Sequence, residues 1–425
     1  MAHETLRVAK FAAMIALKIA WRNLLAAKRR TLITVLLGGV SSALMILFWS
    51  MNEGSYKGMI KNSVEMYSGY VQVQGAGYYD DPGLEKLIFN ADRVAEAIAQ
   101  TPGIALSAQR FEMFALYASD QGAYGGLIAG VEPEKEARLS WVKKSLIDGE
   151  FLSESDENAV ILGEVLARKL GVKTGDIISY ISTATDYATA ADNVIVKGIF
   201  KVGMNEFDGL YGFVNKRYMD EIFYSQNTAT AFVVLPENPG RSDTVAAALK
   251  DRLKDLEVEV LPWQKMNDEL LRAIDLDRAF GGFMAAILFS VIFFVIMIYT
   301  LLAVHVRTRE IGILRAIGTT PGGVFGMLFF EALLAGLIAA ALGVALGGGG
   351  AYWLQENPVP IQMLEEMQEG YGDMGYKIDP VLTALFSWAI IAKSATLIFA
   401  LNLLAVLYPA WRVVRLKPIE AINHV

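Results

Sequence analysis

The chain has 425 residues, of which 54% are hydrophobic and only 20% are charged. A charged fraction this low is unusual for a soluble protein of this length, and the net charge of -7 argues against a protein that binds nucleic acid. Cysteine is absent, which excludes disulfide bonds and thiolate chemistry.

Residues 1–30 are predicted to form a cytoplasmic amphipathic helix that lies in the membrane interface. Its apolar residues group on one side, whereas Lys18, Arg22 and Lys28 lie elsewhere around the helix. The apolar side consists of Phe11, Met14, Ile15, Ile19 and Leu25. The alternative is that this region simply extends the membrane span that follows it.

Four apolar segments are long enough to cross a membrane, which takes about 20 residues. They cover residues 31–53, 273–304, 323–353 and 381–408. The first follows basic residues, as a cleaved signal peptide also would. An uncleaved span is favoured, because the apolar run is long and its exit, Ser50 to Ser55, has no Ala-x-Ala cleavage pattern.

The charges that flank these spans predict their orientation. Basic residues precede the first span, occupy the loop 305–322 and follow the last span in the tail 409–425, whereas the loop 354–380 is acidic. Because basic loops remain in the cytoplasm, we expect both termini there, with the acidic loop and the long insert outside.

The insert between the first two spans, residues 54–272, is predicted to be a large α+β domain. Strand-like runs at residues 69–74, 111–117, 193–200 and 230–235 mix with helix-like runs without strict alternation. The last helix-like run, 265–274, leads directly into the second span. One unbroken helix is therefore expected there, and a flexible joint at Gly281 and Gly282 is the alternative.

The sequence shows no site for catalysis, nucleotide or metal. It lacks the Gly-x-x-x-x-Gly-Lys-Ser/Thr phosphate loop, and the run from Gly347 to Gly350 lies in an apolar span, where close helix packing is expected. His3, His305 and His424 are too scattered for a metal cluster or a hydrolytic triad. We expect no catalytic residue and no cofactor, so that any ATP and Mg²⁺ would be bound by a partner.

Two ionisable residues fall inside predicted spans, where charge is costly and often functional. Glu331 lies about two turns into the third span, and Lys393 lies near the middle of the fourth. Their depths differ by about 10 Å, which argues against a direct pair. Glu331 is expected to contact a neighbouring helix or backbone, whereas a snorkelling and a buried position remain open for Lys393.

The loop from Arg307 to Gly318 is predicted to contain a short amphipathic helix that a soluble motor protein can bind. Ile311, Leu314 and Ile317 share one face of this helix. Charged residues face outward from the other side, with Glu310 and Arg315 toward the partner, while Ile311 and Leu314 are expected to fill a groove on it. The coupling residues are Arg309, Glu310, Ile311, Gly312, Leu314 and Arg315.

Three stretches resemble the MacB/FtsX-like permeases of ABC transporters, the type VII mechanotransmission group. They are the entry 20–32, the run 309–318, which is similar to the coupling helix of that family, and the tail 409–422. Within the family, stretches at 69–73, 160–167, 170–176 and 198–208 look most like lipoprotein-releasing permeases of the LolC/LolE type.

The resemblance implies a multi-pass permease of the bacterial inner membrane with a periplasmic MacB-like domain. It implies an ABC ATPase dimer and a second permease subunit, either a copy or a paralogue, as partners. The substrate would be a lipoprotein or another amphiphile. The alternatives are a MacB-like efflux permease with a periplasmic adaptor and an outer-membrane duct, and an FtsX-like regulator of a cell-wall hydrolase. Residues 182–193 lack the proline of the LolC loop that recruits a carrier, which leaves a periplasmic carrier open.

Acyl chains are expected to enter from the outer leaflet between the first two spans, which are almost wholly apolar. Such chains need no hydrogen-bond partners there, whereas a peptide backbone would. The predicted cleft residues are Met45, Phe48, Trp49, Phe280, Phe283 and Met284. The alternative is that each of them only faces lipid.

Overall fold

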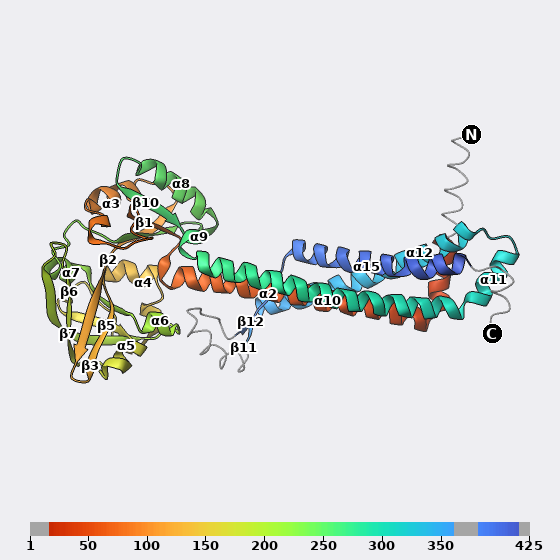
Figure 1. Cartoon of the computed structure of the whole chain (residues 1–425), viewed down its shortest axis with the longest axis horizontal. Coiled ribbons are helices and arrows are strands. Elements are labelled where there is room, and N and C mark those ends of the chain that lie inside the picture. The colour runs from red at the N-terminus through yellow and green to blue at the C-terminus, as the bar shows by residue number, and fades with distance from the viewer. Residues whose placement is uncertain (1–16, 361–380, 416–425) are drawn as a thin grey trace. The chain divides into compact units, whose positions relative to one another are not determined.

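The computed structural model describes residues 17–360 and 381–415 (Figure 1). It divides into a helical unit, with Met1–Tyr56, Asp275–Pro360 and Val381–Val425, and a strand-rich unit that includes Lys57–Ile274. Several predicted features lie outside the described residues. They are Phe11, Met14 and Ile15 of the N-terminal helix, His3 and His424, most of the acidic loop, and the end of the C-terminal motif.

Four helices within the described residues are long and apolar enough to cross a membrane, which confirms the predicted number. They are α2 (Lys28–Ser63), α10 (Asp268–Val306), α12 (Pro321–Gly343) and α15 (Trp388–Val414). The third continues from α12 through the π-helical turn η5 (Val344–Gly348) into α13 (Gly349–Glu356). Short strands β11 (Val359–Pro360) and β12 (Val381–Leu382) pair with each other.

The helix bounds differ from the apolar runs at several ends. Helix α10 is unbroken at Gly281 and Gly282, as expected for one continuous helix. Helix α15 starts at Trp388 rather than at residue 381, because the residues before it are held by hydrogen bonds to other segments. The Leu385 N–H donates to the Ser50 carbonyl at 2.7 Å, and the Phe386 N–H donates to Gln355 Oε1 at 2.8 Å.

Residues 17–26 form a helix that a turn at Ala27 separates from α2. Leu24 is buried against the helical unit, whereas Ile19 and Leu25 are exposed. The apolar residues of this helix therefore divide between a protein-facing side and an exposed side that suits the membrane interface.

Small residues allow α2 to pack closely against the third membrane helix. A Cβ added to Gly343 would lie 2.4 Å from the side chain of Ser42, and one added to Gly347 would lie 2.8 Å from the Ala43 carbonyl oxygen. The glycine run that begins at Gly347 therefore serves helix packing, as predicted, because any side chain at Gly347 would push α2 away.

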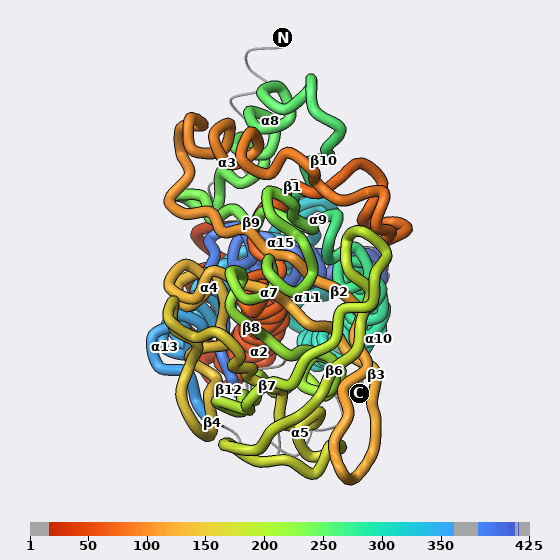
Figure 2. Tube along the Cα trace, turned by 90° about the vertical axis from the view of Figure 1, so that its left-hand side faces the viewer, coloured from red at the N-terminus to blue at the C-terminus, as the bar shows by residue number. Residues whose placement is uncertain are grey.

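The strand-rich unit is built on one mixed ten-stranded sheet with the order β10-β1-β9-β2-β3-β8-β5-β7-β4, and β6 pairs with β2 and β7 (Figure 2). Most neighbours are antiparallel, but β3 with β8 and β5 with β7 are parallel. The strands are β1 (Val71–Gly75), β2 (Ile104–Ser119), β3 (Gly122–Val131), β4 (Leu146–Gly149), β5 (Ala159–Gly163), β6 (Ile177–Thr183), β7 (Thr189–Phe200), β8 (Tyr211–Asn215), β9 (Ala231–Pro236) and β10 (Val258–Pro262).

Helices cover this sheet through short apolar stripes. Val94 and Ile98 of α3 (Ala91–Ala99) and Leu249 of α8 (Ser242–Arg252) pack into one core with β1 and β9. A second core gathers the inner faces of β2, β6 and β7 against α5 (Glu164–Leu170) and α7 (Lys216–Ile222). The remaining short helices are α4 (Pro133–Leu139), α6 (Asn205–Asp208) and α9 (Trp263–Met266). The unit thus mixes helices and strands and is rich in strands.

A fully buried ion pair fixes the π-helical turn η1 (Val64–Ser68), which follows α2, onto the sheet. Arg110 of β2 binds both carboxylate oxygens of Glu136, with Nε–Oε2 at 3.0 Å and Nη2–Oε1 at 2.7 Å. Its third nitrogen donates to the Tyr67 carbonyl at 2.8 Å, and its guanidinium carbon lies 3.6 Å from the centre of the Tyr67 ring. All three guanidinium nitrogens thus donate hydrogen bonds, which offsets part of the cost of burying the charge.

Nearby charges keep this buried arginine ionised. Burial lowers the pKa of Arg110, but the Glu136 carboxylate opposes this effect and holds the pKa above its ordinary value. Burial also raises the pKa of the neighbouring Glu112 carboxyl, against the opposing influence of Arg110. The ion pair of Arg110 with Glu136 is therefore the dominant charged interaction of the domain interior.

Replacing Glu136 with Ala is expected to destabilise the protein by about 3–5 kcal/mol, because Arg110 would remain charged and buried without its partner. The matched control is Glu164→Ala, which removes a partner of Arg168 from a pair that is largely exposed and should cost under about 1 kcal/mol. Thermal unfolding of the full chain in detergent would measure both. Equal melting temperatures for the two variants would contradict the assignment.

Candidate functional site

The predicted coupling segment folds as the short helix α11 (Thr308–Ala316), between α10 and α12. Arg307 occupies the N-cap position, and the helix ends before Ile317. Gly318 then adopts a φ of +107°, a conformation that disfavours residues with a side chain. The Thr320 side chain next accepts a hydrogen bond from the Gly323 N–H at 3.2 Å, which caps the start of α12.

The apolar face of α11 packs onto the chain's own membrane helices. Ile311 is 2% exposed and joins a core with Val304, Val324 and Val406, and Leu314 packs against the same core. Residues at this spacing share one side of a helix, and that side is turned toward α10, α12 and α15. In this structure Ile311 therefore has no free surface with which to fill a groove on a partner, and Leu314 is half-buried.

Other coupling residues are accessible. Arg309 and Glu310 are exposed, Arg315 is half-buried, and Gly312 is buried. Ile317 is 75% exposed, so it does not share the buried face with Ile311 and Leu314 as predicted, because it lies beyond the last turn of α11. The surface that α11 presents thus combines charged side chains with the apolar side chains of Ile313 and Ile317.

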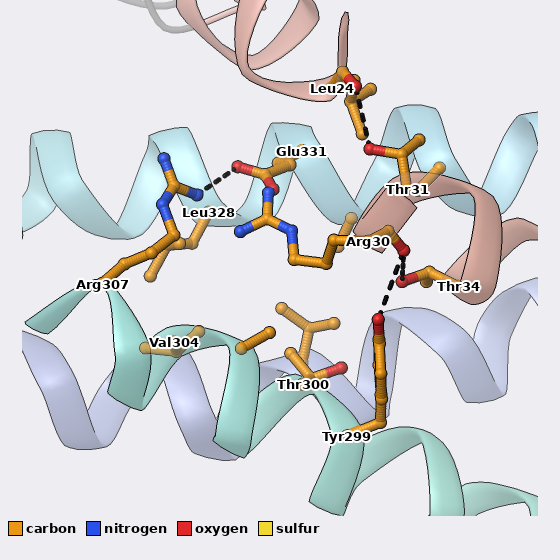
Figure 3. A pocket seen from close by; sticks show the side chains of 14 residues that line it. Leu24, Arg30, Thr31, Thr34, Tyr299, Thr300, Val304, Arg307, Leu328 and Glu331 are labelled. Carbon is orange, nitrogen blue, oxygen red and sulfur yellow. Dashed lines mark hydrogen bonds and ion pairs between the residues drawn. The ribbon is translucent and has the colours of Figure 1, made fainter. Parts of the chain in front are cut away.

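Four charged residues, here termed the inner ion cluster, connect α11 to the membrane helices, and Figure 3 shows three of them, Arg30, Arg307 and Glu331. The four residues are Arg30, Arg307, Glu310 and Glu331. Glu331 of α12 pairs through Oε1 with Arg30 of α2 and through Oε2 with Arg307, whose Nη1 lies at 3.0 Å. Arg307 also reaches Glu310 of α11, with Nε–Oε2 at 3.2 Å. One carboxylate therefore joins the start of α2, the end of α10 and the body of α12.

The inner ion cluster borders a pocket of about 70 Å³ between these helices. Tyr299 of α10 and Thr31 and Thr34 of α2 contribute hydroxyl groups, and the Tyr299 hydroxyl lies 3.4 Å from the Arg30 carbonyl oxygen. The rest of the lining is mainly apolar. The charged groups of the cluster thus lie beside a small cavity between the helices.

The structure gives Glu331 the neighbouring-helix contacts that the sequence predicted, and its partners are arginines rather than Lys393. Sequence reasoning did not identify Arg30 or Arg307 as those partners. The sequence did contain a hint of this pairing, since both arginines lie at the same end of their spans as Glu331. Depth alone could not have distinguished them from the other basic residues nearby.

The predicted cleft residues divide into buried and exposed side chains. Met45 is buried in a small core with Ala285, Phe289 and Ile398, and Trp49 packs at its edge, where its ring lies 6.2 Å from that of Phe289. The side chains exposed on the surface of the helical unit are Phe48, Phe280, Phe283 and Met284. Met45 and, in part, Trp49 therefore stabilise the packing of α2 with α10 and α15, and the four exposed side chains lie on the surface of the helical unit.

Two polar contacts, here termed the outer contacts, join α2 to α10 beyond these residues. Arg278 binds both oxygens of Glu53, at 3.2 and 2.9 Å, and the Tyr56 hydroxyl donates to Asp277 Oδ2 at 2.5 Å. Both Arg278 and Glu53 remain partly exposed. The two helices are thus held together by polar groups at this end and by apolar side chains farther along.

Lys393 lies in the second turn of α15, closer to the start of the helix than its position in the apolar run indicated. Its side chain is exposed, and the ammonium nitrogen lies 5.7 Å from the centre of the Trp49 ring. A lysine at this depth can extend toward the membrane surface, and the aromatic ring provides a favourable electrostatic contact. This arrangement favours the snorkelling position.

Comparison with known proteins matches two family models to the sequence. Residues 31–252 match the MacB-like periplasmic core domain, and residues 282–418 match the FtsX-like permease C-terminal region. The chain is 26% identical over 344 residues to the lipoprotein-releasing system transmembrane protein LolC of Xylella fastidiosa, which covers 78% of this chain and 80% of that protein.

Two further matches are shorter. A stretch of 129 residues is 30% identical to the macrolide export ATP-binding/permease protein MacB 1 of Aeromonas hydrophila, and covers 30% of this chain and 17% of that protein. The crystal structure of the periplasmic region of MacB from Actinobacillus actinomycetemcomitans is similar over 48% of this chain and 94% of that structure, with 10% identity and a TM-score of 0.37.

Proposed function

The chain belongs to the FtsX-like permeases with a MacB-like periplasmic core domain, and from this membership we propose that it helps to extract lipoproteins or other amphiphiles from the outer leaflet of the bacterial inner membrane. The supporting observation is the similarity to the LolC protein, which extends over most of both chains. A permease subunit of an ABC transporter needs an ATPase to drive it, and the sequence has no phosphate loop of its own.

The proposed orientation places both termini and α11 in the cytoplasm and the strand-rich unit in the periplasm. The basic residues around α11 and before α2 support it. An ATPase subunit would then dock on the exposed surface of α11, through Arg309, Glu310 and the apolar side chains of Ile313 and Ile317. Since Ile311 and Leu314 hold α11 on the membrane helices, force applied to α11 would act directly on those helices.

The proposed substrate path is the apolar outer part of α2 and α10. Phe48, Phe280 and Phe283 are accessible, and the described residues there carry no charge until the outer contacts are reached. Acyl chains suit such a surface because they need no hydrogen-bond partners. A second permease subunit, a copy or a paralogue, would complete the cleft by covering the exposed apolar face of α10. A MacB-like efflux role would instead require a path for non-acylated molecules.

We predict that Glu310→Arg combined with Ile317→Asp abolishes co-purification of the ATPase while membrane insertion stays normal. The change reverses a charge and places a second charge in an apolar contact. Ile147→Asp, which changes another exposed isoleucine on β4, is the matched control and should retain the ATPase. Normal ATPase recovery with the double variant would rule out this docking surface.

Photo-crosslinking residues at Phe48 and Phe283 should capture an acylated lipoprotein and miss its non-acylated form. A crosslinker at Leu36, which is exposed on α2 nearer the other end, controls for contact with bulk lipid and should capture neither protein. Mass spectrometry of the adducts would identify them. Equal capture of both forms at Phe48 and Phe283 would favour efflux over recognition of acyl chains.

The purified chain alone is expected not to hydrolyse ATP, because it has no sequence that cradles the phosphates. A phosphate-release assay on protein freed of contaminating ATPases would test this. ATP hydrolysis that persists after such purification, and that scales with the amount of this chain, would refute the proposal that a separate subunit hydrolyses ATP.

A further inference from the structure

We propose that Glu331 is a positioning residue that transmits displacement of α11 to the first turns of α2, with Arg307 as the intermediate. This inference rests on the proposed function, since it assumes that an ATPase moves α11. It goes beyond that function by identifying a specific route from the docking helix to the helix that borders the proposed substrate path.

The first argument is the geometry of the carboxylate. Each oxygen of Glu331 is used by a different segment, Oε1 by Arg30 of α2 and Oε2 by Arg307 at the junction of α10 with α11. The Glu331 side chain is only 13% exposed. Because little water reaches the Glu331 carboxylate, losing either arginine would be costly. A movement of one arginine therefore displaces the carboxylate and, through it, the other arginine.

The second argument is the position of Arg307. This residue is the N-cap of α11, where the backbone leaves the helical conformation with φ -95° and ψ 4°. Its guanidinium contacts an exposed carboxylate, Glu310, on one side and a half-buried carboxylate, Glu331, on the other. An arginine can serve two acidic groups at once because its donors form a rigid planar fork. Arg307 is thus placed where a rotation of α11 alters both contacts.

The third argument is charge balance. Two arginines and two glutamates make the inner ion cluster neutral, and Glu310, the member most exposed to solvent at 69%, lies on the proposed docking surface. If a partner's cationic group takes Glu310, the remaining three members have one positive charge in excess. That excess favours a closer approach of Glu331 to Arg307 and a weaker hold on Arg30. Binding of a partner at the docking surface thereby weakens the ion pair that holds Arg30 of α2.

The fourth argument concerns which part of α2 is able to move. Close packing against the third membrane helix starts at Gly38 and Gly39 and continues through Ser42 and Ala43. Before those residues α2 is held by the ion pair of Arg30, by the contact of Tyr299 with the Arg30 carbonyl and by the buried side chain of Val35, beside a pocket of about 70 Å³. The first turns of α2 can therefore pivot about the glycine contacts when Arg30 is released.

The experiment measures that pivot in the complete transporter, purified with its ATPase through a tag on this chain. The sequence contains no cysteine, so Leu32→Cys on α2 and Leu337→Cys on α12 introduce two unique sites for spin labels. Both side chains are exposed on the helical unit. Pulsed electron paramagnetic resonance would compare their separation without nucleotide and after trapping with ATP and vanadate.

We expect a nucleotide-dependent change in separation for the parent protein and loss of that change for Glu331→Gln, while the ATPase still co-purifies and basal hydrolysis stays within about two-fold. Glu331→Asp should restore part of the change, since it keeps the charge. Thr34→Val, which alters the same pocket without altering charge, is the control and should behave like the parent. An unchanged response in Glu331→Gln would overturn the proposal.

If Glu331→Gln fails to accumulate in the membrane, Arg307→Lys provides the decisive comparison. Lysine keeps the positive charge but cannot contact Glu310 and Glu331 through a planar fork. A full response in Arg307→Lys would overturn the route through this residue, and a lost response with the ATPase retained would support it. Absence of any co-purifying ATPase from the parent protein would instead refute the proposed function itself, which separates the two failures.

Discussion

A carboxylate placed between apolar helices is the constraint on which the helical unit depends. An isolated charge there would cost several kcal/mol in desolvation, and Glu331 avoids that cost only because arginines from two other segments converge on it. Their convergence fixes where α2 starts, where α10 ends and how α11 leaves the bundle. Apolar packing between membrane helices has little directional preference, so a polar contact of this kind specifies the arrangement more strongly than another leucine could.

The strand-rich unit uses the same chemistry for a different purpose. Arg110 and Glu136 are more deeply buried than the inner ion cluster, and each of the three guanidinium nitrogens donates a hydrogen bond. Both members of this pair are about 1% exposed, and the neighbouring Glu112 carboxyl accepts a hydrogen bond from the Tyr67 hydroxyl. The pair holds the turn η1 against the sheet permanently, whereas Arg307 is shared between two acids and is able to change partners.

The sequence predicted the four membrane helices well because hydropathy is a local property that needs no knowledge of neighbours. It predicted their ends less well. Helix α2 continues through the polar residues up to Ser63, where helical propensity persists after the apolar run has stopped. Strand β2 is longer than its apolar core predicted, because Arg110 interrupts the alternating pattern although it is buried with Glu136.

The candidate site shows the same limit. The amphipathic pattern identified α11, but it assigned Ile317 to the buried face since a pattern cannot show where a helix terminates. The pairing of Arg30 with Glu331 joins residues 301 positions apart. Such a pair depends on which helices are neighbours, and one sequence read alone does not contain that information. The sequence located a charge that required a partner, and only the fold identified the partner.

The outer contacts and the inner ion cluster also differ in how they respond to the surrounding solution. Glu53 and Arg278 are partly open to solvent, where dissolved ions screen charges over about 8 Å at physiological ionic strength, whereas the carboxylate of Glu331 is largely shielded. The two ends of the α2–α10 pair therefore have unequal sensitivity to salt. A rise in ionic strength therefore weakens the pair of Arg278 with Glu53 more than it weakens the pairs that Glu331 makes with its two arginines.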